Sequence, residues 1–161
     1  MKIPALHVVL VEPEIPQNTG SIGRLCLATG TTLHLVEPLG FEITDAKLKR
    51  AGLDYWEHLR VCRHASLEAF MQSLPLNAPK VFFSKKAGHT LFEHSFVDGT
   101  YLIFGKETAG LPDWILNSHP TETVRLPMFD ARVRSLNLSN TVGIGVYEAI
   151  RQLSSRLPLS D

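Results

Sequence analysis

The chain has 161 residues, of which 44% are hydrophobic, and it carries 16 basic and 16 acidic side chains. This length suits one domain, residues 1–161, with a continuous core. No apolar run reaches the length of a membrane span, and the N-terminus lacks a signal-peptide core, so we expect a cytoplasmic protein without a membrane partner. Zero net charge excludes a strongly basic domain but leaves room for a local basic face.

Hydrophobic runs and turn residues predict ten elements along the chain. In order they are strand 5–11, helix 19–29, strand 32–36, helix 44–51, helix 66–73, strand 80–84, strand 101–104, helix 112–117, strand 123–126 and helix 138–155. Asn18 is the expected N-cap of the first helix, and Gly30 lies beyond its end. In the last helix Val142, Val146 and Ile150 fall on one side.

Strands that alternate with helices predict βαβ units, and therefore an α/β fold with a mostly parallel sheet covered by helices on both faces. Ligands bind such sheets in loops beyond the carboxyl ends of the strands. Three loops expected there are rich in glycine, proline and polar residues, namely 12–20, 105–112 and 127–135. These loops are the candidate binding site.

Several common catalytic motifs are missing from the sequence. No G-x-G-x-x-G, H-E-x-x-H, C-x-x-C or G-x-S-x-G occurs. Residues 99–106 resemble a P-loop only loosely, because five residues separate the glycines and Glu107 replaces the hydroxyl residue that would bind magnesium. Seven histidines lack ligand spacing, so no metal site is expected. Cys26 and Cys62 lie in apolar surroundings and are predicted to be buried.

Two clusters of basic residues interrupt the even balance of charge. Lys47, Lys49 and Arg50 fall within four residues, and Arg132 and Arg134 share a loop with a single acid. Each cluster by itself is more often a solvated surface than a binding patch. Together they are the candidates for a local basic surface.

Three segments carry a stronger signal. They are Asn18-Thr19-Gly20-Ser21-Ile22-Gly23-Arg24, residues 103–112 (IFGKETAGLP), and residues 125–128 (RLPM) followed by 135–140 (SLNLSN). In this order they resemble the three signature motifs of the SPOUT superfamily of RNA methyltransferases. Residues 11–20 and 50–55 are similar to one bacterial branch, the tRNA (cytidine/uridine-34) 2′-O-methyltransferases. The resemblance extends over residues 8–153.

The resemblance implies an enzyme that transfers a methyl group from S-adenosylmethionine to the ribose 2′-hydroxyl of the wobble nucleotide, with S-adenosylhomocysteine as product and no metal. It further implies a C-terminal trefoil knot, a homodimer, and the tRNA anticodon stem-loop as partner. For the dimer contact we expect the last helix to contribute Val142, Val146 and Ile150, with Gly143 and Gly145 permitting close approach.

Four residues match catalytic or substrate-orienting positions of the superfamily: Arg24, Asn18, Glu107 and Asn137. Spacing alone favours an N-cap for Asn18 and a surface residue for Arg24. The resemblance implies a catalytic or substrate-orienting role for Arg24. Because arginine stays protonated, we expect it to bind RNA phosphate and stabilise the attacking oxygen. Glu107 is expected near the cationic sulfonium or as an anchor for Arg24.

Four further residues match positions that bind the cofactor: Ser84, Gly105, Leu126 and Ser135. From the residues alone, Gly105 and Gly110 indicate a sharp loop that approaches a ligand closely, while Ser135 and Asn137 suit caps of the last helix. The stretch from Met128 to Arg134 departs from the branch, because it is one residue longer and contains no glycine.

Two alternatives stay open. The first is a SPOUT 2′-O-methyltransferase that acts on another tRNA position or on ribosomal RNA. The second is a catalytically silent RNA-binding module, against which the presence of Arg24, Glu107 and Asn137 argues.

Overall fold

A single parallel sheet forms the centre of the computed structural model, which describes residues 3–43, 46, 48 and 56–154. In these residues the sheet has seven strands in the order β3-β2-β1-β6-β4-β7-β5, and every pairing is parallel. The strands are β1 His7–Val11, β2 Thr32–Val36, β3 Val61–His64, β4 Lys80–Phe83, β5 His89–Thr90, β6 Tyr101–Phe104 and β7 Thr123–Arg125. The predicted α/β class is therefore confirmed.

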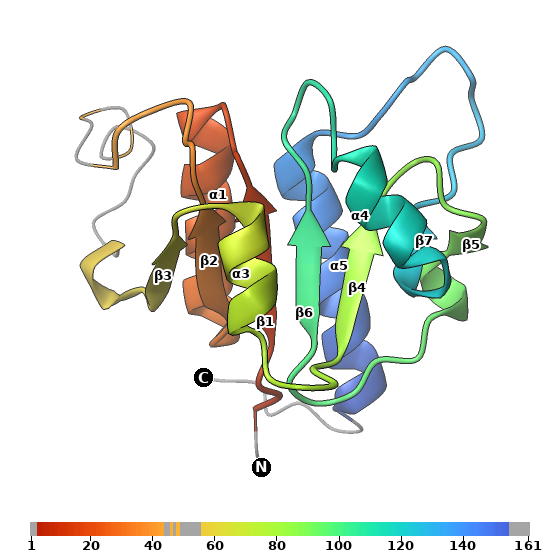
Figure 1. Ribbon diagram of the computed structural model, residues 1–161, viewed down its shortest axis with the longest axis horizontal. Helices are drawn as coiled ribbons and strands as arrows, with labels where there is room; N and C mark the ends of the chain where they lie inside the picture. The colour runs from red at the N-terminus through yellow and green to blue at the C-terminus, as the bar shows by residue number, and fades with distance from the viewer. Residues whose placement is uncertain (1–2, 44–45, 47, 49–55, 155–161) are drawn as a thin grey trace.

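Helices cover both faces of the sheet (Figure 1). They are α1 Pro16–Thr29, α3 Leu67–Ser73, α4 Asp113–Ser118 and α5 Leu138–Leu153, with short 3-10 helices at η1 Trp56–His58, η2 Leu91–Glu93 and η3 Pro120–Glu122. Helices α1 and α5 pack side by side behind the sheet in Figure 1, and α3 and α4 lie in front of it.

The core has two layers because successive side chains of a strand point to opposite faces. In β1, Val8 and Leu10 pack in the layer beneath α1 and α5, whereas Val9 and Val11 pack in the layer beneath α3 and α4. All four are at most 2% exposed. From Val8 to Val11 the strand is therefore buried on both faces, which explains the unbroken hydrophobic run in the sequence.

Most predicted elements are confirmed with ends shifted by one or a few residues, but the start of α1 is a correction. The helix begins at Pro16 with Ile15 as N-cap, so Asn18 lies inside the first turn. Proline suits that turn because the first amides of a helix have no partner within it. The carboxylate of Glu107 accepts hydrogen bonds from the amides of Glu14 and Ile15. Since that acceptor comes from a distant segment, local sequence could not predict this start.

Three other sequence predictions have different outcomes. Strand β3 was not predicted, because its sequence VCRH has neither a long apolar run nor a polar alternation, and its side chains are partly or fully exposed at the edge of the sheet. Cys26 is buried as expected, but the prediction for Cys62 is wrong, since it lies exposed on β3. The helix expected at 44–51 and the cluster Lys47, Lys49 and Arg50 lie largely outside the described residues.

The apolar side of α5 packs inside its own subunit. Val142 and Val146 are fully buried and Ile150 is 7% exposed, all in the layer beneath α1 and α5. Gly145 packs against Phe83, whereas Gly143 faces open space. The expectation that these apolar residues form a dimer contact is therefore wrong. The exposed side of α5 instead presents Ile144 and Tyr147, which are 41% and 54% exposed.

Candidate functional site

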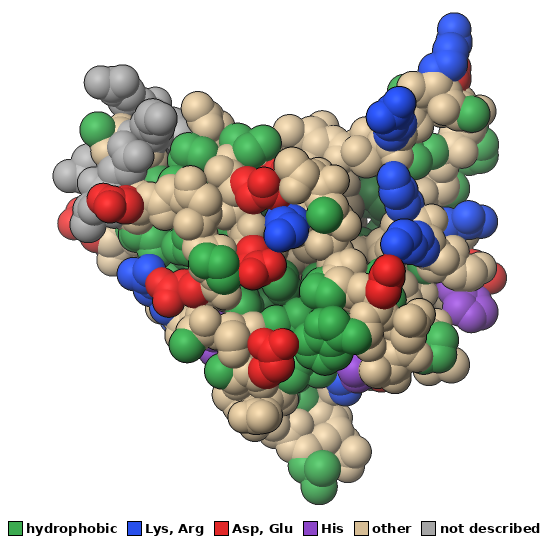
Figure 2. Space-filling view, turned by 45° about the horizontal axis from the view of Figure 1, so that its top comes forward, with side chains coloured by type: hydrophobic (Ala, Val, Ile, Leu, Met, Phe, Trp, Pro, Cys, Tyr) green, Lys and Arg blue, Asp and Glu red, His purple; other side chains and the backbone are tan. Residues whose placement is uncertain are grey.

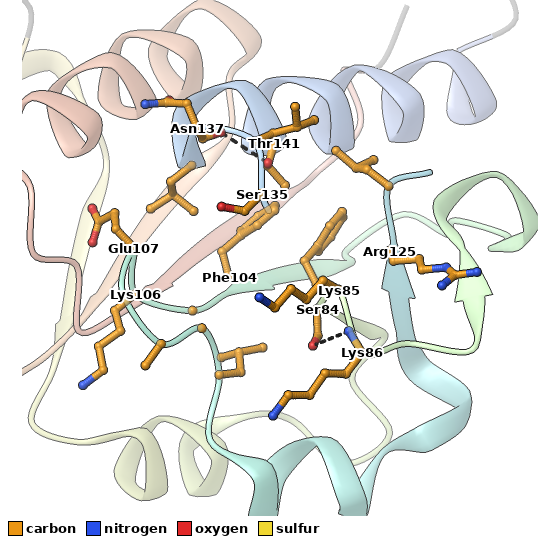
Figure 3. Close-up of a pocket in the computed structure, with 18 of the residues that line it drawn as sticks. Ser84, Lys85, Lys86, Phe104, Lys106, Glu107, Arg125, Ser135, Asn137 and Thr141 are labelled. Atoms are coloured by element: carbon orange, nitrogen blue, oxygen red, sulfur yellow. Dashed lines mark hydrogen bonds between the residues drawn. The ribbon is translucent and has the colours of Figure 1, made fainter. Parts of the chain in front are cut away.

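A cavity of about 400 Å³ opens at the carboxyl ends of three neighbouring strands, β4, β6 and β7 (Figure 3). Each strand supplies the residues that follow its last hydrogen-bonded position, and the segment before α5 closes the remaining side. Among the lining residues are Ser84, Lys85, Gly105, Glu107, Leu126, Ser135, Asn137 and Thr141. The cavity thus lies where open α/β sheets bind ligands.

Gly105 is required by the packing of the loop that follows β6. A Cβ atom at this position would lie 2.1 Å from the carbonyl carbon of Gly110 and 2.2 Å from the nitrogen of Leu111. Gly110 itself has φ of 68°, in the left-handed region, and donates its amide to the Lys106 carbonyl at 2.9 Å. The two glycines therefore fold residues 105–110 into a compact turn whose backbone lines the cavity.

A hydrogen-bonded network joins the three predicted catalytic residues that line the cavity. Asn137 donates its side-chain amide to Asn18 Oδ1 at 3.1 Å, and Asn18 Nδ2 lies 3.4 Å from Glu107 Oε1. These residues come from the start of α5, the first turn of α1 and the loop after β6. Asn137 also caps α5, because its Oδ1 accepts the amide of Ser139 at 2.9 Å. Of the two residues that suited a cap from the sequence, Asn137 is confirmed as the N-cap and Ser135 is not the N-cap.

Glu107 anchors the segment before α1 to the loop after β6. Its Oε2 accepts the Glu14 amide at 2.8 Å, and its Oε1 accepts the Ile15 amide at 3.2 Å. In return Glu14 Oε1 accepts both the hydroxyl and the amide of Thr108, at 2.6 and 3.2 Å. These bonds from Thr108 lower the pKa of the Glu14 carboxyl. Glu107 therefore anchors residues 14, 15 and 18, and it makes no ion pair with Arg24.

Arg24 lies apart from the cavity. It is exposed on α1, it does not line the pocket, and no acidic group in the described part of the chain pairs with it. Arg24 comes six positions after Asn18 on the helix, which corresponds to a distance of about 9 Å along the axis. The other seven predicted site residues all line the same cavity. The residues that the motifs marked therefore divide into seven that line one cavity and Arg24, which lies outside it.

The four residues expected to bind the cofactor surround the cavity from three sides. Ser84 follows β4 and accepts the amide of Lys86 on its hydroxyl at 3.2 Å. Leu126 follows β7 and packs against the core beneath α5. Ser135 precedes α5 and is exposed within the pocket rim. With Gly105 they combine hydroxyl groups, an apolar wall and exposed backbone, which is typical of a small-molecule pocket.

Sequence reasoning missed the basic residues around the cavity. Lys85, Lys86 and Arg125 line it, and all three are exposed. Lys85 extends across the pocket in Figure 3, whereas Arg125 points away from it. Each follows or ends a parallel strand, so their positions after β4 and at the end of β7 were the available signal. Figure 2 shows Lys and Arg side chains gathered along this edge of the molecule.

Two further features are absent from the described part of the chain. No group of three or more His, Cys, Asp or Glu side chains is arranged to hold a metal ion within that part of the chain. None of the helices described is sufficiently long and apolar to cross a membrane.

Comparisons with known proteins agree with this geometry. Residues 5–147 match the model of the SpoU rRNA Methylase family. The tRNA (cytidine(34)-2'-O)-methyltransferase of Burkholderia ambifaria is 48% identical over 148 residues, which cover 91% of this chain and 94% of the relative. A Bacillus subtilis protein provisionally given the same activity is 52% identical over 160 residues, covering 97% and 98% of the two chains.

Solved structures with this fold extend the comparison. One described as structural insights into the 2-OH methylation of C/U34 on tRNA has a TM-score of 0.91 at 47% identity, and it covers 96% of this chain and 100% of that one. The SpoU methyltransferase AviRb from Streptomyces viridochromogenes, in complex with the cofactor AdoMet, has a TM-score of 0.79 at 27% identity. It covers 94% of this chain and 62% of its own.

Proposed function

The chain belongs to the SpoU rRNA methylase family, and on that basis we propose that it transfers a methyl group from S-adenosylmethionine to the ribose 2′-hydroxyl of nucleotide 34 in tRNA. The observation that carries the proposal is the identity of 48% over nearly the whole chain with a tRNA (cytidine(34)-2'-O)-methyltransferase. The cavity described above supports it, because seven residues expected from the motifs line it. A tRNA-modifying enzyme of this kind is expected to act in the cytoplasm.

The cavity fits S-adenosylmethionine in size and chemistry. Its volume of about 400 Å³ falls within the range of small-molecule sites. Leu126, Leu136 and Leu138 provide apolar walls for the adenine ring, while Ser84 and Ser135 provide hydroxyl groups. The backbone after Gly105 offers amides and carbonyls, and the ammonium of Lys85 matches the carboxylate of the methionine moiety. When bound, the cofactor would supply a methyl group on a sulfonium, whose methyl–sulfur bond breaks readily because a neutral thioether, S-adenosylhomocysteine, leaves with the electron pair.

The protein then has to position the ribose and assist removal of its hydroxyl proton. Asn18 and Asn137 fix the junction of α1 and α5 at the rim of the cavity, and Glu107 fixes the loop after β6 against α1. Arg24 is proposed to bind the RNA phosphate and stabilise the attacking oxygen. A planar guanidinium suits that role because it presents several donors in a fixed arrangement and remains charged.

We further propose that two copies of the chain form the working enzyme. Arg24 does not line the cavity of its own subunit, so a neighbouring subunit is one way to bring it to a bound ribose. The exposed side of α5, with Ile144 and Tyr147, lies on the same layer as α1 and provides an apolar contact surface. A two-fold dimer would bring Arg24 of each subunit toward the cavity of the other.

A trefoil knot in the C-terminal segment is part of the proposal. After β7 the chain passes over the carboxyl edge of the sheet, behind the loop that follows β6, and enters α5 on the opposite side (Figure 1). The Asn137–Asn18 hydrogen bond joins that returning segment to the start of α1. This route supports a threaded arrangement, which is otherwise essentially absent from proteins.

Mass spectrometry of tRNA after incubation with the enzyme and isotopically labelled S-adenosylmethionine tests the function. We expect the label on the ribose of nucleotide 34. Label at another tRNA position, or in ribosomal RNA, would favour the first alternative substrate. Binding of RNA without any transferred label would indicate a silent binding module.

A further inference from the structure

The loop between β7 and α5 carries the most exposed aromatic side chain described. Phe129 is 98% exposed, and Val133 in the same loop is 49% exposed. An aromatic ring contributes a large apolar area when it is covered, so leaving one in water has a cost. No described part of this subunit covers Phe129, which indicates that its surface is completed by something else.

The loop holds Phe129 on the outer side of the pocket wall. Met128, Ser135 and Leu136 line the cavity, whereas Phe129 does not. A turn fixes the residues that follow, because Asp130 Oδ1 accepts the amide and the Nε of Arg132, both at 2.9 Å. The amide of Val133 donates to the Asp130 carbonyl at 3.2 Å. Phe129 therefore projects beside the cavity from a locally structured turn.

The cations near this loop differ in whether an acid neutralises them. Arg132 is paired with Asp130, and Lys86 is paired with Asp113. Arg125 and Arg134 are both exposed, and neither forms an ion pair within the described residues, although the charge of Arg125 acts on the nearby Glu93 carboxyl and helps to lower its pKa. Figure 2 shows a row of Lys and Arg side chains along this edge of the hollowed face, while most of the acidic side chains lie across the hollow. The edge thus suits a negatively charged partner.

We propose that Phe129, Arg125 and Arg134 form an RNA-docking edge in which an unstacked base near the target nucleotide lies on the Phe129 ring and neighbouring phosphates contact the two arginines. The proposal rests on the proposed function, because it places the ring beside the cavity where the target ribose would enter. Single-stranded RNA loops expose bases that stack on aromatic side chains, and unpaired cations bind their phosphates.

A second copy of the chain is a poorer occupant of this edge. In a two-fold contact the same surface would face itself, so Arg125 and Arg134 of one copy would approach the same arginines of the other copy and repel them. RNA satisfies both features of the edge at once, since it supplies the base for the ring and the phosphates for the arginines.

Binding of an anticodon stem-loop to the full chain, measured by fluorescence anisotropy with S-adenosylhomocysteine present, tests the proposal. Phe129→Ala should weaken binding by roughly 5- to 150-fold, the range for loss of one stacked base. Phe129→Trp should retain affinity, and its added fluorescence should be quenched by RNA relative to wild type. Leu76→Ala is the matched control and should bind as wild type. Leu76 is 93% exposed in the turn before β4, at the amino ends of the parallel strands and therefore away from the cavity at their carboxyl ends. Arg134→Gln should lower the slope of log affinity against log salt by about one.

Three results would overturn the proposal. One is a wild-type affinity for Phe129→Ala. Another is weaker binding of S-adenosylhomocysteine by this variant in calorimetry, which would make the ring a cover for the cofactor. The last is that Phe129→Ala is a monomer in light scattering while wild type is a dimer, which would make the Phe129 ring a contact between subunits. If wild type methylates nucleotide 34 while Phe129→Ala binds normally, only this inference fails. If wild type does not bind the stem-loop, the proposed function fails with it.

Discussion

Glu107 and Glu14 join two segments that are more than ninety residues apart, because the carboxylate of each accepts hydrogen bonds from the other segment. The two acceptors differ in one respect. Glu107 uses both oxygens, one for the Glu14 amide and the other for Ile15 and Asn18, whereas Glu14 uses only Oε1 for both groups of Thr108. An amide side chain can replace the second arrangement but not the first.

Glu107→Gln should therefore be harmful although it preserves shape. One of its terminal groups would become an NH2 that faces a backbone N–H, and the unsatisfied donors should reduce the free energy of unfolding by about 1–3 kcal/mol. Urea denaturation measures this effect, and methyl transfer should fall in parallel. Glu14→Gln is the control and should change stability little. Equal effects of the two variants would contradict the mutual anchoring.

Gly105→Ala should abolish cofactor binding. The added Cβ would lie 2.1 Å from the carbonyl carbon of Gly110, so the backbone of residues 105–111 would have to move and the cavity wall with it. Calorimetric titration with S-adenosylhomocysteine is the measurement. Gly88→Ala is a matched control, because a Cβ there meets no atom within 4 Å. An unchanged affinity in Gly105→Ala would place the cofactor elsewhere.

How much of this site could be predicted from the sequence depends on the range of the interactions involved. The order of strands and helices followed from local patterns, and the parallel sheet then brought the loops after β4, β6 and β7 to one edge. This is why Ser84, Gly105 and Leu126, which only the motif resemblance marked as cofactor-binding positions, line one cavity. The motif resemblance added the assignment to a methyltransferase family, which the patterns alone did not provide.

What could not be predicted depends on partners that are distant in sequence. The start of α1 depends on Glu107, and the burial of Val146 depends on how α5 lies against the sheet. The edge strand β3 has the weak hydrophobic pattern of a strand with a neighbour on one side only. In each case local spacing was compatible with more than one arrangement, and tertiary packing chose between them.

Arg24→Ala should abolish methyl transfer and leave cofactor binding nearly unchanged, because Arg24 lies outside the cavity and is assigned to the RNA. Arg24→Lys should also be poor, since an ammonium cannot reproduce a planar set of donors. Single-turnover methylation and calorimetry with S-adenosylhomocysteine separate the two effects. Full turnover by Arg24→Ala would remove it from the reaction.

Tyr147→Asp should produce a folded monomer with little activity. Tyr147 is 54% exposed on α5, so a charge there is tolerated by the subunit but not by an apolar contact between subunits. Light scattering and circular dichroism give the mass and the fold. Val146→Asp serves as a contrast, because Val146 is fully buried and its variant should unfold. A wild type that is monomeric at micromolar concentration and fully active would refute the dimeric site.

Acidification should destabilise the fold through a row of three histidines on neighbouring strands. His7 Nδ1 lies 2.9 Å from His34 Nε2, and His34 Nδ1 lies 2.9 Å from His64 Nε2. His34 is only 7% exposed. Burial, followed by the charges that His7 and His64 would carry, lowers the pKa of His34 from 6.5 to about 4. Burial also lowers the pKa of His7 and His64.

The sign follows from proton binding in the two states. Between pH 6.5 and about 4 the unfolded chain holds a proton on His34 that the folded chain does not, so stability decreases as the pH falls through this window. For His34 the loss is at most about 3 kcal/mol, because one pKa unit corresponds to about 1.4 kcal/mol and partial access of solvent to the histidine row screens part of it. His7 and His64 act in the same direction.

Urea denaturation at pH 7.5 and at pH 5 measures this dependence, in a range where ordinary carboxyl groups remain mostly ionised. His34→Gln should be less stable than wild type at pH 7.5 and should lose less stability on acidification. His58→Gln is the control, because His58 is exposed on η1 and lies outside the row, and it should keep the wild-type dependence. A wild-type free energy of unfolding that is equal at the two pH values would show that the three imidazoles accept protons without cost.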